Sequence, residues 1–183
     1  MPSVTGSIAS LYPYAASGTP IVGLEPSCLA ALRSDLAELV SENHELRRRA
    51  EVIGSSVFSL AEYLTRATAE GRWTAPDLSG TEIIAQPHCH QASIVGFDAD
   101  VALLTSAGAR VTRLGGCCGL AGNFGVEQGH YEISVAVAEH GLLPAVRAAT
   151  DNTVVLADGM SCRIQLDDLA DVKAVHLARL LSR

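Results

Sequence analysis

Aromatic residues are scarce in this sequence, and positive charge is outweighed by negative charge. Aromatic side chains make up 4% of the 183 residues, and 13 lysines and arginines stand against 20 aspartates and glutamates, for a net charge of −7. A nucleic-acid-binding surface needs cations to contact phosphates, and a single-strand binder also needs aromatic rings on which bases stack. The composition therefore argues against nucleic acid as a partner.

Long apolar runs are also missing, although hydrophobic residues make up 48% of the chain. A membrane-spanning helix needs about 20 consecutive apolar residues, and no segment provides them. The first residues, MPSVTGSIAS, lack the basic start and apolar core of a signal peptide. We therefore expect a cytoplasmic protein that is peripheral to the inner membrane only through a partner.

The cysteines do not suit a disulfide framework, because they are odd in number and two of them are adjacent. They are Cys28, Cys89, Cys117, Cys118 and Cys162. In a reducing compartment such cysteines are metal ligands, catalytic thiols or small buried residues. The chain has neither the C-x-x-C pairs of zinc ribbons and bacterial ferredoxins nor the G-x-G-x-x-G dinucleotide fingerprint.

Short apolar segments alternate with stretches of helical periodicity along most of the chain. Strands are predicted at 19–24, 81–85, 110–114, 153–157 and 172–175. Helices are predicted at 27–40, along an apolar stripe from Ile53 to Leu64, after an Asp98 cap, after the glycine-rich segment that ends at Gly125, after a Ser161 cap, and at 177–181. This order predicts an α/β protein with Rossmann-like, parallel βαβ units.

A faint internal repeat suggests how the chain is organised. The segment IVGLEPSC at 21–28 is similar to VLADGMSC at 155–162, each a strand followed by a turn and a Ser-Cys pair. We predict a partial first repeat at 1–72 and a complete cysteine-rich lobe at 73–183. Because the first repeat is incomplete, we expect the chain to be the C-terminal part of a longer protein whose upstream repeat is missing here.

Four of the cysteines follow predicted strands of the second lobe. The carboxyl ends of parallel strands meet at one edge of a sheet, so Cys89, Cys117, Cys118 and Cys162 are expected to converge. Four thiolates suit an iron–sulfur cluster or zinc. The flanking Gly116 and Gly119 allow both adjacent side chains to turn to one centre, where backbone N–H groups favour thiolates.

These segments together resemble a known family, the Cys-Cys-Gly cysteine-rich domain found in heterodisulfide reductase and in the glycolate oxidase iron–sulfur subunit. The likeness is greatest to the C-terminal part of fused flavin/iron–sulfur dehydrogenases of 2-hydroxy acids, and its most specific part is the Cys-Cys-Gly segment. The matching segments are EPSC at 25–28, HCH at 88–90, GCCGLAGNFG at 116–125 and DGMSCR at 158–163.

The resemblance implies an electron-transfer domain rather than a complete enzyme. Its expected cofactor is a [4Fe–4S] cluster held by the four converging cysteines, and Cys28 would be the last ligand of a first-repeat site. His90 is expected beside the cluster as a spare ligand or proton donor. FAD would belong to a partner, a flavin-binding oxidase domain or subunit that oxidises a 2-hydroxy acid.

Three alternatives remain open from the residues alone. Gly159 and Glu25 stand where the family's final C-x-x-C pairs have a cysteine, so a four-cysteine cubane or a structural zinc site fits the count better than a five-cysteine non-cubane cluster. A thiol–disulfide protein that uses Cys117 and Cys118 directly is a further alternative. The remaining interpretation is that the cysteines have no chemical role and are buried packing residues.

Overall fold

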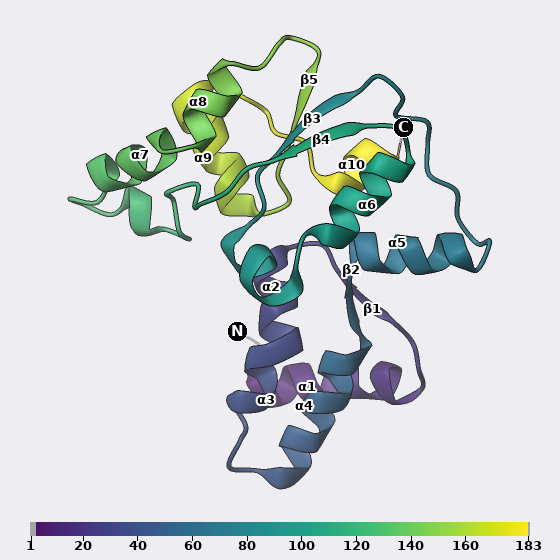
Figure 1. Cartoon of the computed structure of the whole chain (residues 1–183). Coiled ribbons are helices and arrows are strands. Elements are labelled where there is room, and N and C mark those ends of the chain that lie inside the picture. The colour runs from purple at the N-terminus through teal and green to yellow at the C-terminus, as the bar shows by residue number, and fades with distance from the viewer. Residues whose placement is uncertain (1–2, 183) are drawn as a thin grey trace.

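The structure, a computed structural model, describes residues 3–182 and is an α/β fold (Figure 1). Its strands are β1 (Ile21–Gly23), β2 (Val57–Ser59), β3 (Glu82–Ala85), β4 (Arg110–Arg113) and β5 (Thr153–Leu156). Its α-helices are α1 (Val4–Ala16), α2 (Pro26–Ala30), α3 (Leu36–Glu38), α4 (His44–Ser56), α5 (Leu60–Ala69), α6 (Asp98–Ser106), α7 (Tyr131–Glu139), α8 (Leu142–Arg147), α9 (Met160–Ala170) and α10 (Leu177–Leu181). Two π-helical segments, η1 (Ala31–Asp35) and η2 (Gln91–Val95), and a short 3-10 helix, η3 (Phe124–Val126), complete the order.

The strands form two small sheets, and every pairing within them is parallel. The larger sheet has the order β4-β3-β5, with Glu82 opposite Arg110 on one side and Thr153 on the other. The smaller sheet pairs β1 with β2. Parallel neighbours need crossover connections, which here run through helices. The predicted α/β class with parallel βαβ-type units is therefore confirmed.

The larger sheet carries helices on both of its faces. Val154 and Leu156 of β5 pack into a core with α6 and α10, whereas Val155 between them packs into a core with α8 and α9. This alternation is what a strand dictates, because successive side chains point to opposite faces. Figure 1 shows α6 and α10 on one side of β3–β5 and α8 and α9 on the other. The carboxyl ends of the three strands are left free to carry a site.

The prediction of one continuous helix through Ile53 to Leu64 is wrong, because β2 interrupts this segment. Ser59 caps α5 by accepting a hydrogen bond from the Glu62 backbone N–H, and the Glu62 carboxylate accepts one from the Ser59 N–H in return. This capping box starts a new helix at Leu60. The β-branched and aromatic pair Val57-Phe58 before it favours strand over helix.

A third core holds the N-terminal part together. It packs α1, α2 and α4 around buried residues that include Ile8, Leu29 and Ile53. Helix α5 instead contributes Ala61 to the core of α6 and α10. The change from one core to the other thus falls at β2, and the division at residue 72 stays a prediction.

Smaller differences concern helix starts and the last predicted strand. Asp98 is the first residue of α6 after Phe97, and Gly159 rather than Ser161 precedes α9. The predicted strand 172–175 is reduced to one bridge from Val175 to Leu156, because α9 continues to Ala170 and leaves little chain to pair. No helix within residues 3–182 has the length and apolar character to cross a membrane.

Candidate functional site

Three of the predicted site cysteines line one cavity beyond the carboxyl ends of the larger sheet. Cys89 follows β3, and Cys117 and Cys118 follow β4. The cavity measures about 410 Å³ and is lined by Ser27, His88, Cys89, His90, Cys117, Cys118, Ala121, Gly122 and Ser161. The convergence expected from parallel strand ends is therefore present in the fold for these three thiols.

Cys162 joins the group through Cys118 rather than through the cavity wall. It lies in the first turns of α9 with no exposed surface, and it shares a core with Cys118, which is 2% exposed. The two thiols contact each other closely enough to shift each other's pKa. Cys89 and Cys117 form a second contacting pair. The four thiols, called the four-thiol group below, are thus near enough to affect one another's pKa.

Backbone N–H groups of the glycine-rich turn point at the sulfur atoms. The Gly119 N–H donates to Cys117 Sγ at 3.3 Å, and the backbone N–H groups of Leu120 and Ala121 help to lower the pKa of the Cys118 thiol. Successive amides that converge in this way form a concave anion-binding nest. Amides placed in this way stabilise thiolates.

The same contacts set the ionisation of the thiols. A hydrogen bond from Cys162, together with the two backbone donors, lowers the pKa of Cys118 to about 6 against the opposing effect of burial. The shared hydrogen bond and burial raise the pKa of Cys162. Burial and the contact with Cys117 raise the pKa of Cys89 to about 11. Among Cys89, Cys118 and Cys162, only Cys118 is shifted towards the thiolate.

Replacing Cys162 by alanine should raise the Cys118 pKa from about 6 towards the ordinary thiol value of 9.0, because the largest cause of the depression is lost. The measurement is a thiolate absorbance titration of metal-free protein. A matched variant, Cys28→Ala, should leave the transition near pH 6 in place. A transition that is unchanged in Cys162→Ala would contradict the assigned pairing.

Buried polar side chains behind the site hold the glycine-rich turn in place, and none of them was predicted from the sequence. Gln86, 1% exposed, donates from Nε2 to the carbonyl of Gly116 at 3.1 Å. Gln165 donates to the Ser134 hydroxyl at 2.8 Å, and a Cβ on Gly119 would overlap the Ser134 carbonyl oxygen. The sequence held one signal of such a role, which is that Gln86 comes directly after a predicted strand.

The two histidines beside Cys89 form the wall of the cavity. His88 Nδ1 accepts a hydrogen bond from the His90 backbone N–H at 3.2 Å, which leaves Nε2 as the protonated nitrogen of a neutral ring. Burial lowers the pKa of His88 below its ordinary value. His90 is exposed and lines the cavity, where we predicted it as a spare ligand or proton donor. His88 instead orders the turn that carries Cys89.

Cys28 lies in α2, apart from the four-thiol group. Glu25 caps this helix by accepting from the N–H groups of Ser27 and Cys28 at 2.8 and 3.0 Å. Burial and the nearby Glu25 carboxylate raise the pKa of Cys28. Its neighbour Ser27 reaches the cavity wall. As arranged here, Cys28 is an exposed, protonated thiol, and its role as a first-repeat ligand stays a prediction.

The residues fit an inorganic cluster by their donor chemistry and by the size of the cavity. Thiolates bound by several backbone N–H groups are typical of iron–sulfur sites. Among residues 3–182, no group of three or more histidine, cysteine, aspartate or glutamate side chains is placed to hold a metal ion as the side chains stand. Comparisons of the chain with protein-family models, curated proteins and solved structures find no match. Any functional assignment therefore depends on the chain's own residues and their geometry.

Proposed function

We propose that this protein is an iron–sulfur electron-transfer domain of an oxidoreductase, with its cluster bound by Cys89, Cys117, Cys118 and Cys162. The observation that supports it best is the nest of backbone N–H groups on the sulfurs of Cys117 and Cys118. It stabilises negative charge on thiolates without any cationic side chain. A neutral packing role for the same cysteines would not need such donors.

The cavity beside the thiols favours a cluster over a single zinc ion. A zinc ion with four thiolates at about 2.3 Å leaves no room for a further cavity between its ligands. The space against Cys89, Cys117 and Cys118 is about 410 Å³, which suits a group of several atoms. Cys162 would reach the same group from the first turns of α9, next to the lining residue Ser161.

The chain's own residues would bind and shield the cofactor. The cysteines would ligate it, and a bound cluster would supply single-electron transfer. The N–H groups of Gly119, Leu120 and Ala121 would offset the charge on the sulfurs, and Gln86 would hold the turn in its bound geometry. By the family resemblance, the electrons would come from a flavin domain that oxidises a 2-hydroxy acid in the cytoplasm.

The deciding experiment is iron and sulfide analysis of anaerobically purified protein, with a visible spectrum before and after dithionite. We expect about four iron and four sulfide per chain and a brown colour that bleaches on reduction. Stoichiometric zinc without colour would replace this proposal with a structural zinc site. A metal-free protein that does not incorporate a cluster on incubation with iron and sulfide would contradict it.

A thiol–disulfide function is the second candidate, and the low pKa of Cys118 is the observation that favours it. A thiolate beside a second thiol suits exchange chemistry. Cys118 is only 2% exposed, however, so a substrate disulfide could not reach its sulfur without local opening. Rapid alkylation of Cys118 in freshly isolated protein, without release of metal, would favour this candidate over the cluster.

A further inference from the structure

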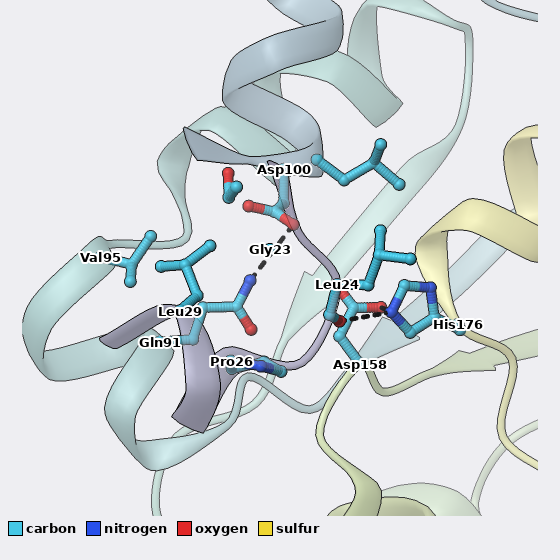
Figure 2. A pocket seen from close by; sticks show the side chains of 11 residues that line it. Gly23, Leu24, Pro26, Leu29, Gln91, Val95, Asp100, Asp158 and His176 are labelled. Carbon is cyan, nitrogen blue, oxygen red and sulfur yellow. Dashed lines mark hydrogen bonds and ion pairs between the residues drawn. The ribbon is translucent and has the colours of Figure 1, made fainter. Parts of the chain in front are cut away.

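A second, much smaller cavity lies between the N-terminal part and the larger sheet (Figure 2). Its volume is about 20 Å³. Residues of β1, α2 and the β2–α5 junction line one side, and Gln91, Asp100, Asp158 and His176 line the other. A volume of this size holds one water molecule when polar atoms surround it. The cavity is separate from the cysteine site in its lining residues.

Two buried polar side chains on this cavity have unused oxygen atoms. Asp100 is 1% exposed and Gln91 is 4% exposed, and Gln91 Nε2 donates to Asp100 Oδ1 at 3.3 Å. Within residues 3–182, Asp100 Oδ2 and Gln91 Oε1 have no hydrogen-bond partner. A buried oxygen without a partner is costly, and both residues line the same small space, which indicates a ligand there.

None of the neighbouring charged groups supplies Asp100 with a cation. Asp158 Oδ1 accepts from the Leu177 N–H at 2.8 Å, and Arg163 is held by the Asp158 backbone carbonyl at 2.6 Å. Glu62, the nearest acid on α5, is paired with Arg33 at 2.6 Å. An ionised Asp100 would therefore be a buried charge facing other acids without a cation of its own.

His176 does not supply that cation. Its Nδ1 accepts from the Ala178 N–H at 2.9 Å, so the ring is neutral and its Nε2 carries the hydrogen. Nε2 lies 2.8 Å from the Leu24 carbonyl oxygen and 3.7 Å from Asp158 Oδ1, and Figure 2 shows these three residues together. Histidine in this tautomer is a donor without a net charge.

We propose that this cavity binds one water molecule and one proton, the proton on Asp100 Oδ2, and that this proton keeps the two parts of the protein packed together. The protonated Oδ2 donates to the water, which gives this buried oxygen a partner. Burial, and after it the Asp158 carboxylate, raises the pKa of Asp100 to about 7. The proton is therefore present in mildly acidic solution and lost in alkaline solution.

The expected pH dependence follows from the raised pKa. The folded protein holds this proton up to about pH 7, whereas the unfolded chain releases it above the ordinary value of 3.8. Asp100 stabilises the fold fully below pH 3.8, and this contribution is lost as the pH rises to about 7. Across that window the folding equilibrium constant, taken relative to Asp100→Asn, should fall about tenfold per pH unit.

The test compares urea unfolding of wild type, Asp100→Asn and Asp98→Asn between pH 4 and pH 8. Asparagine mimics the protonated acid, so Asp100→Asn should lose the tenfold dependence. Asp98 lies in the same helix with its side chain 98% exposed, so Asp98→Asn should follow wild type. Identical pH profiles for wild type and Asp100→Asn would overturn the proposal.

Infrared spectroscopy of the wild type keeps the proposal testable if Asp100→Asn fails to fold. A carbonyl band of a buried protonated carboxyl should be present at pH 5 and should disappear above about pH 8. Absence of that band at pH 5 would refute the protonation of Asp100. A crystal structure without a water molecule within hydrogen-bond distance of Asp100 would refute the water site.

Discussion

Replacing Cys118 by serine should abolish cluster binding, with iron falling from about four atoms per chain to near zero. The pKa of Cys118 is lowered to about 6 by Cys162 and by the backbone N–H groups of Leu120 and Ala121. Serine keeps the size but replaces a thiolate with an alcohol that stays protonated at neutral pH. The measurements are iron and sulfide content and the visible spectrum after anaerobic purification.

The matched control is Cys28→Ser, which changes the same atoms in an exposed cysteine outside the four-thiol group. It should bind as much iron as wild type. Urea unfolding of the metal-free variants shows whether either one is misfolded, and we expect losses of less than about 2 kcal/mol. Full iron occupancy in Cys118→Ser would contradict the proposed ligand set, and loss of iron in Cys28→Ser would add Cys28 to it.

The fold class, and the position of Cys89, Cys117 and Cys118 on one cavity, could be predicted because both depend on local patterns. Alternating strands and helices imply parallel βαβ units, and parallel strands bring their carboxyl ends to one edge. Cys89, Cys117 and Cys162 follow β3, β4 and β5 at that edge. No knowledge of long-range packing was needed for this step.

The interruption at β2 was missed because the apolar stripe does not change there. Ile53, Val57, Leu60 and Leu64 keep helical spacing across the break, so periodicity alone joins α4 to α5. The capping box of Ser59 and Glu62 was the contrary signal. Once β2 exists it pairs with β1, and this small sheet brings Gly23 and Ser59 to the cavity beside Asp100.

The supporting polar groups could not be predicted, because their roles arise from tertiary contacts alone. Gln86 contacts Gly116 across 30 residues and Gln165 contacts Ser134 across 31. A buried glutamine has no local periodicity that separates it from a surface glutamine. The pairing of Cys118 with Cys162 is of the same kind, since convergence of strand ends does not specify which thiols touch.

Gly119→Ala is expected to be the most damaging single-residue change in the glycine-rich turn. Gly119 has φ +97°, a region that L side chains rarely adopt, and its added Cβ would overlap the Ser134 carbonyl oxygen of α7. That oxygen belongs to the backbone of a packed helix, so moving it would cost unfolding free energy. Strain and overpacking together should cost about 2–5 kcal/mol of unfolding free energy. The measurement is urea unfolding of the metal-free protein.

Gly122→Ala separates the clash from backbone strain, because Gly122 has φ +74° but open space around its Cβ position. It should cost only about 1–2 kcal/mol. Gly119→Ala should also reduce iron binding, since any shift of the turn moves the Gly119 N–H away from Cys117 Sγ. Equal losses of stability in the two variants would mean that α7 yields to the new methyl group. The position of the thiols would then not depend on the packing of Gly119 against Ser134.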